Sequence, residues 1–287
     1  MKIPVIDTHQ HLWDPARFSY SWMEPYPSIR QRAMVEEYRT AAADLDIVQT
    51  VYVDTDVDEG DLGSELRAIC ALADDPANRI AGIVAGARME REDPFAHFGE
   101  LAGHPAIKGV RRVLHTQPDD LSRSPAFVAN VRSLAERSWS FDLCVLARQL
   151  PLALRLVEEC PDVAFVLDHC GGPDIAAGER SAWSRGLRDL AQCPHVTCKV
   201  SGLVTCAGPE KVSADVLRPW FDEVVACFGW DRMMWGGDWP VCTLAAPLSK
   251  WMDLSAALTA DATPEQKARF FHGNARRIYR LEAAGPQ

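Results

Sequence analysis

The sequence has no basic stripe interleaved with aromatic residues, and its 40 Asp and Glu residues outnumber 30 Lys and Arg residues. The resulting formal charge of -10 argues against a nucleic-acid-binding surface. No apolar run approaches the roughly 18–20 residues that a membrane helix needs. Asp7 and His9 interrupt any apolar leader at the N-terminus. We therefore expect a cytoplasmic protein that binds neither nucleic acid nor a membrane.

Cysteine pairs and linkers are also missing. The nine cysteines are scattered, none forms a C-x-x-C pair, and most lie in apolar stretches such as "AICAL" and "VVACF". This argues against a zinc knuckle or a thioredoxin-like site and favours cysteine as a small core residue in a reducing compartment. Because no segment rich in Pro, Gly or Ser divides the chain, we expect one domain over residues 1–287.

Eight short β-branched runs alternate with helix-like segments. The runs cover residues 3–8, 47–53, 80–86, 106–114, 140–146, 163–168, 196–201 and 232–237. Several are continuously apolar, which suits parallel strands covered on both faces. This alternation predicts a single-domain, distorted (β/α)8 barrel of the TIM type. An open doubly wound sheet is the alternative, but no G-x-G-x-x-G follows the first run.

The helix-like segments carry recognisable signals at their ends. Ser124-Pro125 begins one helix, Pro151 lies in the first turn of another, and Gly229 is a plausible C-cap for the segment from residue 213. Thr263-Pro264 begins a last helix, which we expect to run to about residue 281. The segment from about residue 283 onward is expected to be disordered.

Polar side chains follow the apolar runs, and the first run ends in "VIDTHQHLWD". Side chains of a strand alternate between faces, so His9 and His11 point the same way, and Asp7 joins them if the strand stays regular. In a (β/α)8 barrel the active site lies at the C-terminal ends of the strands. The other polar residues within the runs or at their ends are Lys108, Arg111, Arg112, His115, Asp168, His169, Lys199, Ser201 and Asp238.

This ordered set resembles the amidohydrolase superfamily. The stretches "DTHQHLW", "LDHCGGP", "KVSG", "GGDWP" and "FFHGNARRIY" are similar, more specifically, to its sugar-lactonase branch, which includes L-fuconolactonases and L-rhamnonolactonases. The 2-pyrone-4,6-dicarboxylate hydrolases are related to that branch. The resemblance implies a hydrolase of a sugar lactone in carbohydrate catabolism, for example L-fucose degradation. Gly237 is a departure, because relatives commonly carry serine before the aspartate.

The resemblance also implies roles for four residues. Asp238 corresponds to the general base of the family, and such a carboxylate can take a proton from water. His9, His11 and His169 are expected to be catalytic as donors to the reacting carbonyl, or to bind a single divalent metal such as zinc together with Asp238. Because no bridging lysine or glutamate is evident, a binuclear centre is not expected. Since a sugar lactone is an activated ester, we expect that no cofactor is strictly required.

Substrate contacts are predicted for a wider set of residues. One of Arg111 and Arg112 must face inward, although alternation does not say which. The full predicted substrate-binding set is Arg111, Arg112, His115, Lys199, Ser201, Trp22 and Trp239. Two other functions remain open, a metal-dependent non-oxidative decarboxylase of an aromatic or unsaturated acid and a non-catalytic binding barrel. The expected partner is a small-molecule sugar lactone, and no pattern specifies an oligomeric state.

Overall fold

Eight parallel strands form one sheet, and neighbouring strands follow the order of the sequence from β1 to β8. The computed structural model describes residues 3–283. Seven strands lie within predicted runs and β1 overlaps the first run, which confirms the (β/α)8 prediction. The strands are β1 (Val5–Gln10), β2 (Ile47–Val53), β3 (Ile80–Gly86), β4 (Ile107–Val113), β5 (Ser140–Cys144), β6 (Phe165–Leu167), β7 (Val196–Val200) and β8 (Met233–Trp235).

Contacts between β1 and the end of β8 close the sheet into a barrel. Gln10 forms a parallel bridge with Trp239. The His11 amide donates to the Trp239 carbonyl at 2.9 Å, and the Asp238 amide donates to the His9 carbonyl at 2.8 Å. Because these bonds lie at the C-terminal ends of both strands, barrel closure itself brings the His-x-His segment beside Asp238.

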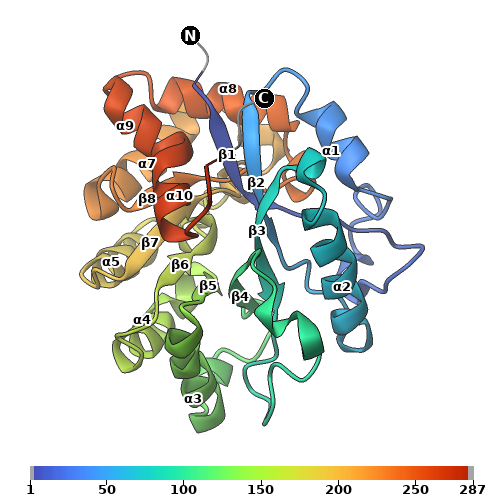
Figure 1. Ribbon diagram of the computed structural model, residues 1–287. Coiled ribbons are helices and arrows are strands. Elements are labelled where there is room, and N and C mark those ends of the chain that lie inside the picture. The colour runs from blue at the N-terminus through green and yellow to red at the C-terminus, as the bar shows by residue number, and fades with distance from the viewer. Residues whose placement is uncertain (1–2, 284–287) are drawn as a thin grey trace.

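The helices surround the strands (Figure 1). Their amphipathic faces cover the apolar outer surface of the sheet, as expected for parallel strands buried on both sides. The α-helices are α1 (Val35–Ala41), α2 (Leu62–Ala73), α3 (Pro125–Ser133), α4 (Leu150–Glu159), α5 (Ser181–Ala191), α6 (Leu203–Ala207), α7 (Ala214–Phe228), α8 (Leu248–Leu258), α9 (Pro264–Ala268) and α10 (Asn274–Ile278).

Two segments depart from regular alternation. The connection from β3 to β4 contains only the 3-10 helix Gly99–Gly103, and its sequence includes Pro94 and two glycines that disfavour a longer helix. The predicted last helix begins at Thr263, whose side chain accepts from the Gln266 amide. It is not continuous, because the π-helix Arg269–Gly273 separates α9 from α10. Residues 284–287, in the tail expected to be disordered, lie outside the described residues.

The segment after α10 closes the N-terminal end of the barrel. Tyr279 and Leu281 pack with interior side chains of the strands, such as Ile6. Arg280 donates to the Lys108 carbonyl at 3.2 Å, near the start of β4. With this end filled, the opposite end remains for a site. We call that end, where the strands finish, the C-terminal mouth.

All nine cysteines are free thiols, and most are buried, as expected for small core residues. Across residues 3–283, the helices are too short or too polar to traverse a lipid bilayer.

Candidate active site

Four of the predicted site residues meet at the C-terminal mouth. The Asp238 Oδ1 atom lies 3.4 Å from His11 Nε2 and 3.7 Å from His9 Nε2. Its Oδ2 atom lies 4.0 Å from His169 Nδ1. The side chain of His169 is 21% exposed, whereas those of the other three are at most 5% exposed. His169 is therefore the ring of this group that a substrate can reach most easily.

An irregularity in β1 separates Asp7 from the two histidines. The pairing register of β1 shifts between Asp7 and Gln10. The Asp7 carboxylate accepts hydrogen bonds from Tyr38 Oη at 2.8 Å and from the Gly237 amide at 2.7 Å. Burial raises the pKa of Asp7 even though these bonds oppose the shift. Asp7 therefore does not join the histidines, and it ties β1 to the residue that precedes Asp238.

Two of the four site residues have left-handed backbone conformations. The φ angles are 51° at His169 and 56° at Asp238. Aspartate and histidine are among the non-glycine residues that adopt this region most readily, although it still carries some strain. At both positions the backbone turns sharply as the strand ends, and this turn directs the side chain across the mouth.

Gly237 leaves no room for a side chain. A Cβ atom there would lie 2.5 Å from Asp7 Oδ2 and 2.9 Å from Leu248 Cδ1. We expect Gly237→Ala to lower the free energy of unfolding by about 1–3 kcal/mol, the usual cost of overpacking, as measured by urea denaturation. Gly60→Ala is the matched control, because a Cβ there has nothing within 4 Å. Equal stability of the two variants would contradict this reading of the Gly237 environment.

Hydrogen bonds define which ring nitrogens of His9 and His11 carry hydrogen. His11 Nδ1 lies 2.8 Å from the Val53 carbonyl oxygen, which only accepts, so Nδ1 must donate. Arg111 Nη1 lies 3.3 Å from His9 Nε2, and a guanidinium only donates, so Nε2 must accept. In the neutral rings, both Nε2 atoms therefore carry a lone pair and lie near Asp238 Oδ1, although that of His9 also accepts from Arg111. A proton or a divalent cation between them would satisfy this arrangement.

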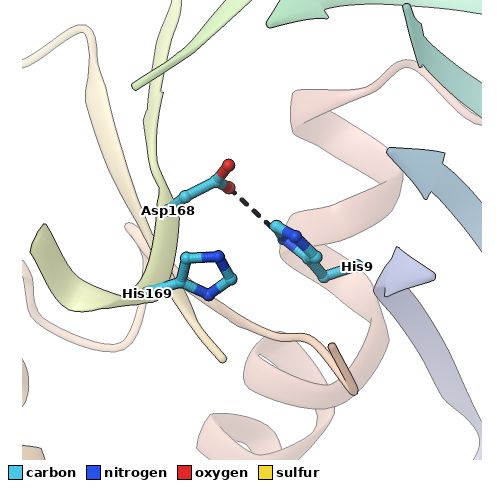
Figure 2. Close-up of side chains that lie close together, drawn as sticks. All are labelled: His9, Asp168 and His169. Atoms are coloured by element: carbon cyan, nitrogen blue, oxygen red, sulfur yellow. Dashed lines mark ion pairs between the residues drawn. The ribbon is translucent and has the colours of Figure 1, made fainter. Parts of the chain in front are cut away.

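The donor chemistry therefore fits one divalent ion held by His9, His11 and Asp238. Their ligand atoms lie within 4.8 Å of one another, and two imidazoles with a carboxylate are a usual set for zinc. A second group, His9, Asp168 and His169, is equally close (Figure 2). There the Asp168 carboxylate already contacts two cationic side chains, so this second group is the poorer metal site.

Asp168 forms ion pairs with two buried cationic side chains. Lys199 Nζ lies 2.9 Å from its Oδ1 atom, and Arg111 Nη1 lies 3.3 Å from its Oδ2 atom. Burial opposes ionisation, but Lys199, His9 and Arg111 outweigh burial and hold the pKa of Asp168 well below its usual range. Burial also lowers the pKa of His9 well below its usual value. The pair therefore consists of an ionised carboxylate and a neutral imidazole.

Whereas the pKa of His9 is lowered, the pKa of His169 is raised. Burial lowers its pKa, but the Asp238 carboxylate and a contact with the Cys144 thiol outweigh burial, and the net shift is upward. Its Nδ1 atom lies 2.9 Å from Ser201 Oγ. Because Ser201 is fully buried, this predicted substrate-binding residue orients the His169 ring from below. A cationic His169 can donate a hydrogen bond into the mouth.

The two arginines of β4 have different surroundings. Arg111 reaches His9 and Asp168, whereas Arg112 donates to Glu90 at 2.7 Å and lies near Asp56. The structure therefore identifies Arg111 as the inward-facing arginine, which alternation alone could not decide. Arg112 forms an ion pair in the loops that follow β2 and β3.

The remaining predicted contacts lie around or beneath the mouth. Lys199 is fully buried beneath His9. The exposed His115 contacts Cys144 through Nδ1 at 3.3 Å. Trp22 donates to the Thr55 carbonyl and packs on Trp13, which in turn stacks on His11. Trp239 is buried, and its ring packs against the ring of Tyr38 in α1.

The sequence places Asp168 among the polar residues at the strand ends but assigns it no role, and it does not single out Asp142. Asp168 ends the apolar run "VAFVL", and Asp142 interrupts the apolar run "SFDLCVL". A carboxylate inside such a run needs a buried partner, and both aspartates have one in Lys199. The signal was therefore present, but the identity of the partner required the register of three strands.

The model of the family described as Amidohydrolase matches residues 6–281. The chain belongs to the amidohydrolase family. It is therefore an enzyme of this family rather than a non-catalytic binding barrel. The chain is 30% identical over 288 residues to an L-fucono-1,5-lactonase of Burkholderia ambifaria, and the match covers 96% of each chain. This confirms the resemblance to sugar lactonases.

Solved structures of relatives agree in fold. An amidohydrolase from Burkholderia multivorans with bound zinc has a TM-score of 0.87 and 28% identity, covering 97% of this chain and 100% of that chain. A 5-carboxyvanillate decarboxylase from Sphingomonas paucimobilis has a TM-score of 0.67 and 14% identity, covering 98% and 100%. At that identity, the likeness to the decarboxylase shows the fold alone.

Proposed function

We propose that this amidohydrolase opens a sugar lactone to the free sugar acid, with Asp238 as the general base. The observation that carries the proposal is the position of the Asp238 carboxylate, within 3.4–4.0 Å of three histidine rings at the C-terminal mouth. The similarity to an L-fucono-1,5-lactonase over almost the whole chain supports the substrate class. We take L-fucono-1,5-lactone as the first substrate to test, and L-fucose degradation as the corresponding role.

The proposed reaction balances with one carboxylate. Asp238 takes a proton from water as the water oxygen attacks the lactone carbonyl carbon. The tetrahedral intermediate then collapses, and the bond from this carbon to the ring oxygen breaks. The proton held on Asp238 passes to the leaving alkoxide, which yields a hydroxy acid and returns Asp238 to its ionised form.

Developing negative charge on the carbonyl oxygen needs a donor already in place. His169 fits this role because its ring is the most exposed of the three and its pKa is raised. Arg111 adds positive charge behind His9, although its hydrogen bonds are already made to protein groups. We propose that His169 is the direct donor and that Arg111 contributes through the field.

A divalent metal would be held by His9, His11 and Asp238, whose ligand atoms lie within 4.8 Å of one another. A bound ion would supply Lewis acidity. We propose that turnover does not require it, because a sugar lactone is an activated ester and cationic groups already stand at the mouth. The proposed site is thus able to bind zinc without depending on it.

Removal of metal tests this point. We expect protein treated with chelator, with its metal content checked, to keep most of its turnover of L-fucono-1,5-lactone. The measurement is acid release in a weakly buffered pH-indicator assay across a panel of 1,5- and 1,4-aldonolactones, with untreated protein as the control. Loss of activity that zinc restores stoichiometrically would refute metal independence while supporting lactone hydrolysis.

The same panel tests the function itself. Turnover of one or more aldonolactones well above the spontaneous rate supports the proposal. No turnover of any aldonolactone, with release of carbon dioxide from an aromatic acid by the zinc-loaded protein, would replace it with the decarboxylase alternative.

A further inference from the structure

A buried charge network lies beneath the histidines. Lys199 Nζ in β7 lies 2.8 Å from Asp142 Oδ2 in β5 and 2.9 Å from Asp168 Oδ1 after β6. All three side chains are fully buried, and the Tyr279 ring lies 5.6 Å from the ammonium group. A fully buried ammonium with two carboxylate partners is not available to a substrate. The role of Lys199 must therefore be exerted through its partners.

Asp142 is fixed on the side away from the mouth. Its Oδ2 atom accepts from Tyr279 Oη at 2.8 Å as well as from Lys199, and its Oδ1 atom accepts from Ser140 Oγ at 3.1 Å. Because both oxygens have partners, this carboxylate has little freedom to rotate. It holds Lys199 at a defined position in the barrel interior, and Lys199 in turn holds Asp168.

Asp168 faces three groups that can donate. Lys199 and Arg111 contact its two oxygens. His9 Nδ1 lies 3.4 Å from Oδ1 (Figure 2). This distance is longer than an ordinary hydrogen bond, and His9 Nδ1 and Asp168 Oδ1 are both buried without a hydrogen-bond partner among residues 3–283, so Asp168 Oδ1 is the acceptor available to His9 Nδ1. Arg111 donates to the opposite nitrogen, Nε2, so the hydrogen of neutral His9 belongs on Nδ1, facing Asp168.

We propose that Asp168 is a positioning residue for His9. Held by Lys199 and Arg111, it receives the Nδ1 hydrogen and thereby fixes the ring with its unprotonated Nε2 atom beside Arg111 and Asp238. Carboxylates that orient a histidine in this way affect activity through the ring they hold. The structural part of the inference stands on the contacts alone, and only its kinetic consequence rests on the proposed lactonase function.

The wild-type protein provides the first test. In metal-free protein labelled with 15N-histidine, long-range 1H–15N correlation spectra distinguish the two neutral tautomers, and comparison with His9→Gln identifies the His9 signals. We expect His9 to carry its hydrogen on Nδ1. A His9 ring with its hydrogen on Nε2 would overturn the proposal, whatever any variant does.

Asp168→Asn provides the second test. Asparagine has only one acceptor oxygen, so its NH2 group must replace either Oδ1 or Oδ2 of Asp168. In either position the NH2 group faces another donor. We expect loss of the single Nδ1-hydrogen state of His9. We also expect a decrease in kcat for the lactone of about ten- to a hundredfold, with a smaller change in KM.

Asp142→Asn is the matched control, because it neutralises the other carboxylate on Lys199 but does not touch His9. We expect it to keep the wild-type tautomer and to lose less kcat than Asp168→Asn. Equal losses with unchanged tautomers would show general damage to the barrel and would overturn the positioning role. The expected tautomer in a protein without lactonase activity would refute the proposed function and leave this role of Asp168 supported.

Discussion

We expect Asp238→Asn to fold normally and to lose at least about a hundredfold in kcat on a sugar lactone, the usual scale for a positioned acid–base group. The amide cannot take a proton from water, and it cannot return one to the leaving alkoxide. Asparagine keeps the shape of aspartate and also tolerates a φ of 56°. The substitution therefore removes the chemistry while retaining the backbone turn.

The measurement is steady-state turnover, together with the melting temperature and circular dichroism of each variant. Asp119→Asn is a suitable control, because this aspartate follows β4 and its side chain is 47% exposed, paired with Arg148. We expect that control to retain turnover close to that of the unmodified protein. Near-normal lactonase activity in Asp238→Asn would exclude Asp238 as the base.

The meeting of His9, His11, His169 and Asp238 was predictable from the sequence because parallel strands end at one mouth. Each of these residues follows an apolar run, and the barrel topology determines the rest. Their separation along the chain is therefore no obstacle to predicting that they are neighbours. The sharp backbone turns at His169 and Asp238 were not predictable, since nothing in "LDHCGG" or "GGDWP" specifies the φ of a single residue.

Side-chain direction was the main limit of the sequence argument. Arg111 and Arg112 are adjacent, so a shift of one residue in the register of β4 would exchange their roles. Asp7 was expected beside the histidines only if β1 stayed regular, and the register shift after Asp7 sends its carboxylate to Tyr38 instead. Such irregularities depend on neighbouring strands rather than on the local sequence.

The buried ion pairs were harder still to predict. Lys199 looked like a donor to substrate because it lies near the end of a strand. Its two partners, Asp142 and Asp168, come from β5 and from the turn after β6. Only the register of the three strands shows that these carboxylates neutralise the Lys199 charge. A polar residue near the mouth of a barrel can thus support the site from beneath without touching the substrate.

A second large effect is expected from Glu65, a buried acid of α2 beside the loop that follows β2. The side chain contacts Thr55 Oγ1, and Tyr20 Oη lies 3.5 Å from its Oε1 atom. Burial, and secondarily the Asp54 carboxylate, raises the pKa of Glu65 from 4.5 to about 8. The neighbouring hydroxyls oppose this shift but are too weak to offset burial.

The sign of the resulting pH dependence follows from linkage. The folded state holds the Glu65 proton more tightly than the unfolded state does, so this group costs no stability below about pH 4.5. The cost grows as the pH rises toward about 8 and is constant above it. At about 1.4 kcal/mol per pKa unit, the total is on the order of 3–5 kcal/mol.

We therefore expect Glu65→Gln to gain stability relative to the unmodified protein as the pH rises. Glutamine preserves an acceptor for the Thr55 hydroxyl but has no proton to lose. Chemical denaturation at pH 5, 7 and 8.5 measures the difference in the free energy of unfolding between the two proteins, and other titrating groups largely cancel in that difference. Glu100→Gln, at an exposed position, should show a difference that does not vary with pH. The same flat profile for Glu65→Gln would mean that the Glu65 carboxyl ionises in the folded protein as easily as in the unfolded chain.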